Sequence, residues 1–205
     1  MTATTRDSIE ELKRAATEQG AGEAVRTIAG PTLETWMRAL DGKDADPERL
    51  DDLATLMTAR LSIRDAALIA AVEPKLDTAT VIDMAARPHA FNNKTLLTET
   101  IKAAFDDPHI RPDETRLARA VREACAMADR ARKHGGPVAQ PYALAAYLAW
   151  WDGDGKAATL AALAALDDDP ETSLAIMVAA MAASGRYPAY PVSNTHMTLP
   201  TIIPL

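Results

Sequence analysis

Hydrophobic side chains recur roughly every three or four residues along most of this chain, which is the spacing of one face of an amphipathic α-helix. One such stripe consists of Leu33, Trp36, Met37 and Leu40. Signals for helix ends separate the segments: Asp46 and Pro47 place a capping acid before a proline at the first helical position. Only residues 80–82, which are all β-branched, suggest a strand instead. The pattern predicts an all-α protein of about ten short antiparallel helices.

Other polar residues stand just before a hydrophobic run and are predicted to cap the helix that follows. These predicted caps are Asp7, Ser62, and either Asn92 or Asn93.

The most regular part of the chain is residues 137–191, where a turn at 152–155 and an Asp-Asp-Pro stop at 168–170 divide three apolar segments. Small residues there have the spacing of the second helix and closing proline of a tetratricopeptide repeat: Ala158, Ala162, Ala165 and Pro170. About 34 residues earlier, the repeat length, a similar series precedes Gly136. The segment predicts stacked helices, in a bundle or a short α-solenoid with tetratricopeptide-like hairpins at its C-terminal end.

No linker rich in glycine or serine divides the helical segments, so residues 1–191 are predicted to form a single helical domain. The end of the chain has a different composition. No Asp, Glu, Lys or Arg follows Arg186, and residues 192–205 show no helical spacing. We expect residues 192–205 to be a poorly ordered or non-native tail.

Composition and charge narrow the function classes. The net charge of −7 argues against a general nucleic-acid or anionic-membrane binder, because both need a basic surface. The single cysteine leaves no partner for an internal disulfide. The first residues lack the apolar core of a signal peptide, and no window reaches the roughly 20 apolar residues of a membrane span. We expect a soluble cytoplasmic protein.

Residues 146–175 have the sequence AYLAWWDGDGKAATLAALAALDDDPETSLA. This combination of an aromatic helix, a Gly-Asp-Gly turn, an Ala-Leu-rich helix and an Asp-Pro stop resembles the C-terminal signature of an actinobacterial family called domain of unknown function 4192. Residues 64–68 (RDAAL) resemble an internal element of the same family. The resemblance extends over roughly residues 60–191 and implies no known activity. Because such proteins usually carry a further N-terminal half, it also implies that this chain is a short variant or a fragment.

The sequence Asp152-Gly153-Asp154-Gly155 invites two ligand-binding interpretations. A calcium loop that began at Asp152 would need a bidentate Glu at its twelfth position, where this chain has Leu163. A phosphate cradle at the following helix would normally be preceded by a strand, which the pattern does not predict here. We therefore favour an interhelical turn in which Asp154 caps the next helix.

Trp150 and Trp151 are adjacent, so in a helix their side chains point about 100° apart. One is expected in the core and the other near the surface, where an exposed tryptophan could anchor a partner. Packing in the core is the interpretation we favour for the pair. The candidate partner-binding residues are Trp150, Trp151, Arg64, Asp65, Asp152 and Asp154.

Arg116, Arg119 and Arg122 form a row along one predicted helix. The row could contact nucleic acid, but acidic residues are interspersed with it, which favours a solvated helix face. The four histidines have no His-x-x-x-His or Glu-x-x-His spacing, so neither a metal site nor a cofactor is predicted.

The sequence thus favours a non-enzymatic protein-interaction module that uses a groove near the tryptophans. Its partner would be another protein or a second copy of this chain. Two alternatives stay open. One is an enzyme whose site is assembled from Arg64, Asp65 and the turn at 152–154, and the other is an accessory protein that binds nucleic acid through the arginine row.

Overall fold

A computed structural model describes residues 3–190 of the chain. Within these residues all regular structure is helical, so the prediction of an all-α protein is confirmed. The β-branched residues 80–82 lie inside a helix, which excludes the alternative of a strand there. The predicted tail at 192–205 lies outside the described residues.

The described residues form eleven α-helices and one π-helix. They are α1 (Ala3–Gln19), α2 (Ala21–Ala24), the π-helix η1 (Val25–Ala29), α3 (Gly30–Leu40), α4 (Pro47–Ala59), α5 (Leu61–Val72), α6 (Thr78–Ala86), α7 (Phe91–Asp106), α8 (Glu114–Lys133), α9 (Ala139–Trp151), α10 (Gly155–Asp168) and α11 (Ser173–Ala183). Among the described residues, no helix is long and apolar enough to cross a lipid bilayer.

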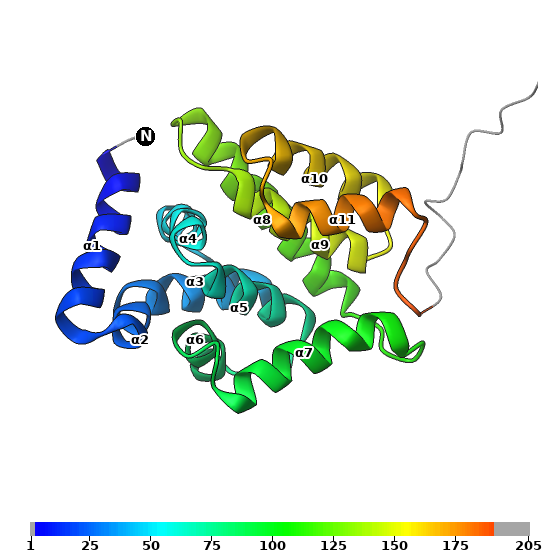
Figure 1. Cartoon of the computed structure of the whole chain (residues 1–205), viewed down its shortest axis with the longest axis horizontal. Helices are drawn as coiled ribbons and strands as arrows, with labels where there is room; N and C mark the ends of the chain where they lie inside the picture. The colour runs from blue at the N-terminus through cyan, green and yellow to red at the C-terminus, as the bar shows by residue number, and fades with distance from the viewer. Residues whose placement is uncertain (1–2, 191–205) are drawn as a thin grey trace, which may run out of the picture.

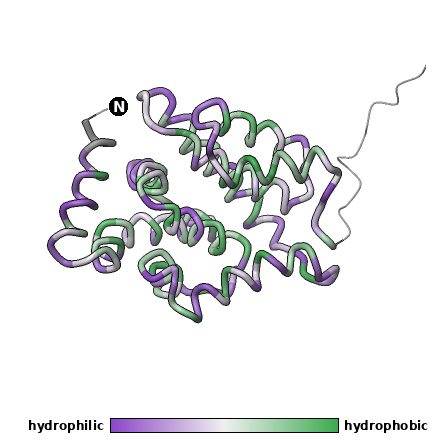
Figure 2. The backbone as a smooth tube through the Cα atoms, in the orientation of Figure 1, coloured by the Kyte–Doolittle hydropathy of each residue, from purple (hydrophilic) through white to green (hydrophobic). Residues whose placement is uncertain are grey.

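The helices form two groups that share one core (Figure 1). Helices α8 to α11 pack together on one side, and α1 to α6 pack together on the other. Helices α3, α4 and α5 contact α8, and α4 and α5 also contact α9. Helix α1 stands at the outer edge of the first group, and it is largely hydrophilic along its length (Figure 2).

Helix α9 lies at the centre of the C-terminal group. It contacts α4, α5, α8, α10 and α11, and all of its residues except Tyr142 are buried. A helix that is apolar on every side must be surrounded by other elements, because no side of it can face water without exposing apolar surface. The sequence of residues 139–151 therefore determines that the other helices of this group pack around α9.

Local capping signals were good predictors of some helix ends. Asp46 precedes α4 and its Oδ1 accepts a hydrogen bond from the backbone N–H of Glu48 at 3.0 Å, as predicted. The predicted cap at Asp7 is wrong, because α1 begins four residues earlier, at Ala3. The predicted cap at Ser62 is also wrong: α5 begins before it, and its hydroxyl donates instead to the carbonyl of Ala85 on α6, at 2.8 Å.

Asn93 does not cap α7, which begins at Phe91, but joins a polar cluster between η1, α6 and α7. Asp83 is the acceptor at the centre of this cluster. Its carboxylate receives hydrogen bonds from Arg26 Nη2 at 2.7 Å, from Arg87 Nε and Nη2 at 2.8 Å each, and from Asn93 Nδ2 at 2.9 Å. The bonds from Arg87 and then from Asn93 hold the pKa of Asp83 below its ordinary value of 3.8.

This cluster predicts a specific acid sensitivity. Because the pKa of Asp83 is lowered in the folded state, its contribution to stability is complete above pH 3.8 and is lost as the pH falls below that value. We expect Asp83→Asn to lower the free energy of unfolding at pH 7 by about 1–2 kcal/mol, and by less at pH 3. Urea denaturation at the two pH values measures this difference.

The exposed Glu99 on α7 gives the matched control, since Glu99→Gln removes a carboxylate from the same region without touching the cluster. We expect Glu99→Gln to leave stability nearly unchanged at both pH values. If Asp83→Asn and the unmodified protein lost stability in parallel from pH 7 to pH 3, the assignment would be wrong.

Candidate functional site

Both tryptophans of α9 lie in the core. Trp150 is 0% exposed and Trp151 is 2% exposed, so the expectation that one of them lies near the surface is wrong. The ring centroid of Trp150 is 5.0 Å from that of Phe105 on α7 and 5.5 Å from that of Tyr147. Its Nε1 donates a hydrogen bond to the carbonyl of Arg186 at 2.7 Å. In this structure neither tryptophan is available to a partner, and core packing is confirmed for both.

The turn between α9 and α10 has the role that its sequence predicts. Asp154 Oδ1 accepts a hydrogen bond from the backbone N–H of Ala157 at 2.9 Å, so Asp154 caps α10. Gly153 has a φ of 81°, a left-handed conformation that favours glycine. Asp152 lies close enough to influence Tyr190: burial, and then the charges of Asp152 and Glu114, raise the pKa of Tyr190 above its ordinary value.

Arg64 and Asp65 lie far from this turn. Arg64 is buried, and its Nη2 donates to Asp65 Oδ1 at 2.6 Å while its Nη1 donates to Gln140 Oε1 at 2.8 Å. Gln140 lies at the start of α9, whereas Asp152 follows its end, about 18 Å away along the helix axis. The structure thus does not bring Arg64, Asp65 and the turn together. The expectation of one enzymatic site built from all of them is corrected.

The arginine row on α8 is only partly solvated. Arg116 is buried, with Nη1 at 2.7 Å from Asp41 Oδ1, and with Nε and Nη2 at 3.1 and 2.9 Å from the carbonyl of Ala70. Arg119 Nη1 donates to the carbonyl of Leu40 at 3.2 Å. Only Arg122 is exposed. The expectation of a fully solvated face is wrong, because two of the three arginines bind the C-terminal ends of α3 and α5. The alternative of a nucleic-acid contact loses Arg116, whose guanidinium is buried.

The hydrogen bonds of Arg116 have a clear cause in the sequence. In α5 the carbonyl of Ala70 would ordinarily accept from the N–H four residues later, but that residue is Pro74, which has none. The guanidinium of Arg116 supplies the missing donors, and its positive charge also suits a helix C-terminus. Its position is therefore explained by packing between α3, α5 and α8.

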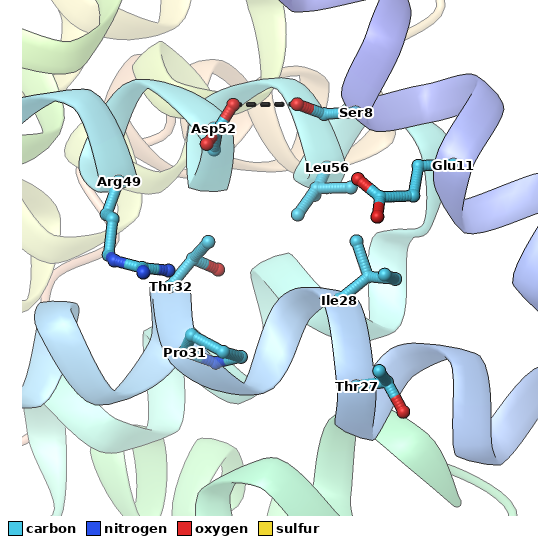
Figure 3. Close-up of a pocket in the computed structure, with 9 residues that line it drawn as sticks. All are labelled: Ser8, Glu11, Thr27, Ile28, Pro31, Thr32, Arg49, Asp52 and Leu56. Carbon is cyan, nitrogen blue, oxygen red and sulfur yellow. Dashed lines mark hydrogen bonds between the residues drawn. The ribbon is translucent and has the colours of Figure 1, made fainter.

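One small cleft lies between α1, η1, α3 and α4, with a volume of about 210 Å³ (Figure 3). Glu11 and Arg49 reach toward it from different sides, and Ser8 Oγ donates to Asp52 Oδ1 at 2.7 Å on one wall. Glu11 and Arg49 are exposed. The buried polar atoms that lack a hydrogen-bond partner in residues 3–190 lie elsewhere, on Arg130, Tyr147, Trp151 and Tyr190. The cleft can admit a small polar molecule, but Glu11 and Arg49 are open to solvent and Asp52 is already bonded to Ser8.

An exposed hydrophobic surface on α10 and α11 was not predicted from the sequence. Seven large hydrophobic side chains are exposed in the described part of the chain, and four of them lie on α10 and α11. These four form what we call the outer face of the C-terminal hairpin: Leu160 (60% exposed), Leu163 (55%), Ile176 (48%) and Met177 (38%). The signal that could have revealed it is the tetratricopeptide-like spacing itself, because leucines that alternate with buried alanines must point away from the core.

Small side chains form the inner side of α10. Its buried residues are Ala158, Ala162 and Ala165, all 0% exposed. Leu160 and Leu163 therefore differ from the leucines of an ordinary amphipathic surface helix, which face the core.

Comparison with known proteins identifies no relative. No family model, no curated protein and no solved structure matches the chain. The resemblance of residues 60–191 to the actinobacterial family therefore stays a prediction.

Proposed function

We propose that this protein is a protein-interaction module and that it binds its partner through the outer face of the C-terminal hairpin. The observation that supports the proposal is the placement of Leu160 and Leu163 toward water on a helix whose fully buried residues are all alanines. Covering a leucine side chain contributes about 1.5–3 kcal/mol. Large apolar side chains exposed on two helices that pack against each other favour a site that another protein covers.

In this proposal the tryptophans have a positioning role. Trp150 and Trp151 fill the centre of the C-terminal group, and α10 and α11 pack against α9. We also infer that α9, α10 and α11 stack in a tetratricopeptide-like manner, which the burial of Ala158, Ala162 and Ala165 supports. The rigid core of α9 then holds the outer face in place.

Site-specific photo-crosslinking tests the proposal. A benzophenone amino acid at Ile176, in protein expressed in its native host, is expected to give an adduct of one discrete mass. The same probe at Phe91, which is 83% exposed but lies on α7, is the matched control and is expected to give none. The adduct should disappear when Leu160→Ser and Leu163→Ser are added, because the partner loses the surface that it covers.

An adduct at both positions, or one that persists without the two leucines, would show that exposure alone causes the reaction and would contradict the proposal. Mass spectrometry of the adduct identifies the captured chain, which separates another protein from a second copy of this one.

A further inference from the structure

The exposed residues of α10 continue as a stripe beyond the two leucines. Lys156, Leu160, Leu163 and Asp167 are all exposed, and they are separated by four, three and four residues. This spacing keeps them on one side of the helix and is the spacing at which two helices pack along a common seam. The stripe lies opposite the buried alanines.

The two charged residues of the stripe have no partner of opposite charge within residues 3–190. Neither Lys156 nor Asp167 forms an ion pair there, and about 16 Å of helix separates them from each other. The neighbouring acids are different. Asp168 Oδ2 accepts from the backbone N–H groups of Val138 and Ala139 at 3.0 and 2.9 Å, so it binds the start of α9.

These two charges are also unfavourable for the stability of α10 itself. Lys156 lies in the first turn, near the positive end of the helix dipole, and Asp167 lies in the last turn, near the negative end. Each position favours a charge of the opposite sign. An isolated α10 would be more stable with the two charges exchanged, so the stripe is better explained by something outside the chain.

The stripe has a symmetry of its own. The midpoint between Leu160 and Leu163 is also the midpoint between Lys156 and Asp167. A two-fold axis through that point, perpendicular to the helix, brings Leu160 of one copy against Leu163 of the other. The same operation brings Lys156 of each copy against Asp167 of its neighbour.

We propose that α10 is an isologous dimer interface, in which the outer faces of two copies of this chain pack with their α10 helices antiparallel. This inference rests on the proposed function and names the partner of the same surface. An isologous contact requires one patch to be complementary to itself, and the sequence Lys–Leu–Leu–Asp meets that condition in the antiparallel direction. In the parallel direction like charges would face each other. The charges of Lys156 and Asp167 therefore favour the antiparallel orientation of the two α10 helices.

The area available implies a weak and reversible dimer. A contact made mainly by one helix is smaller than a standard interface, which buries roughly 800 Å² per partner. The leucines supply the apolar centre, and the two exposed ion pairs at the rim act mainly on orientation and association rate. We therefore expect the dimer at high protein concentration and the 21.9 kDa monomer on dilution.

Charge exchange tests the pairing. We expect Lys156→Glu alone and Asp167→Lys alone each to weaken the dimer by about tenfold or more, because each homodimer then holds two like-charge contacts. A mixture of the two variants should restore association, since in the mixed dimer each lysine again faces a carboxylate. Both variants should fold, because each new charge suits its end of the helix. Sedimentation velocity measures the mass, native mass spectrometry identifies the mixed dimer, and circular dichroism checks the fold.

Leu160→Ser with Leu163→Ser is expected to give a monomer at every concentration. The inference is overturned if the unmodified protein stays at 21.9 kDa up to several hundred micromolar, or if the mixture of charge variants forms no mixed dimer. If the probe at Ile176 then captures a different protein, the proposed function stands and only the identity of the partner changes. If the probe at Ile176 captures nothing, both the proposed function and the dimer inference fail.

Discussion

Trp150→Ala is expected to lower the free energy of unfolding by about 4 kcal/mol, which is the middle of the range for removing a large aromatic side chain from a core. The indole is fully buried between Phe105 of α7 and Tyr147 of α9. Its loss leaves a cavity at the point where α7 meets the C-terminal group. It also leaves the carbonyl of Arg186 without the donor that now lies at 2.7 Å. Chemical denaturation followed by circular dichroism measures the change.

Phenylalanine at the two tryptophan positions provides a matched comparison. Trp150→Phe removes the indole N–H that binds Arg186, whereas Trp151→Phe removes an N–H that is buried without a hydrogen-bond partner. We expect Trp150→Phe to be more destabilising than Trp151→Phe by about 1 kcal/mol, which is the contribution of one hydrogen bond. Equal effects would show that the bond to Arg186 contributes nothing. A Trp150→Ala variant that loses less than about 1 kcal/mol would contradict the core assignment itself.

This expected loss changes how binding experiments should be designed. If Trp150→Ala abolished association with a partner, the cause would be an unfolded or loosened core and not a missing contact. Variants on the outer face, such as Leu160→Ser and Leu163→Ser, remove surface that is already exposed. They separate binding from stability, which substitutions of the tryptophans cannot do.

The tryptophans also show what a single sequence can predict about this fold. The helical spacing and the helix-ending residues correctly predict that α9 exists and that a turn capped by Asp154 follows it. The prediction of one exposed tryptophan failed because the angle between adjacent side chains describes one helix only. Exposure depends on how many neighbours surround that helix, and α9 has neighbours on all sides.

The helix ends show the same difference between what local sequence predicts and what depends on long-range contacts. Asp46 and Asp154 cap the helices that follow them because the acceptor and the N–H lie two or three residues apart. Ser62 and Asn93 are the same kind of residue in a similar position, yet Ser62 binds a carbonyl 23 residues away. Asn93 binds Asp83, ten residues back. No pattern within one segment distinguishes a side chain that caps its own helix from one that binds another.

The candidate surface was predictable in part. The alanine spacing in residues 158–165 predicts the buried side of α10, and the leucines between those alanines then lie on the opposite side. What the sequence leaves open is whether another helix of the same chain covers them. In residues 3–190 none does, which is a property of the tertiary arrangement.

The second large effect is expected at Arg116, where Arg116→Ala should lower the free energy of unfolding by about 2–3 kcal/mol, because it leaves a buried carbonyl without a donor. Truncation removes both donors from the carbonyl of Ala70, which has no helical partner because residue 74 is proline. It also removes the cation from Asp41 at 2.7 Å, although that carboxyl is partly exposed and water can replace the lost bond.

Arg122→Ala, on the same helix and in the same row, is the matched control for Arg116→Ala. Its guanidinium is exposed and lies 3.6 Å from Glu123, an ion pair on the surface, so we expect a change of less than about 1 kcal/mol. Arg116→Lys should fall between the two, because one ammonium group can bind Ala70 or Asp41 but lacks the planar fork that binds both. Urea denaturation of the three variants orders them. If Arg116→Ala and Arg122→Ala had equal effects, the row would be a surface feature after all, and its contact with the ends of α3 and α5 would carry no stability.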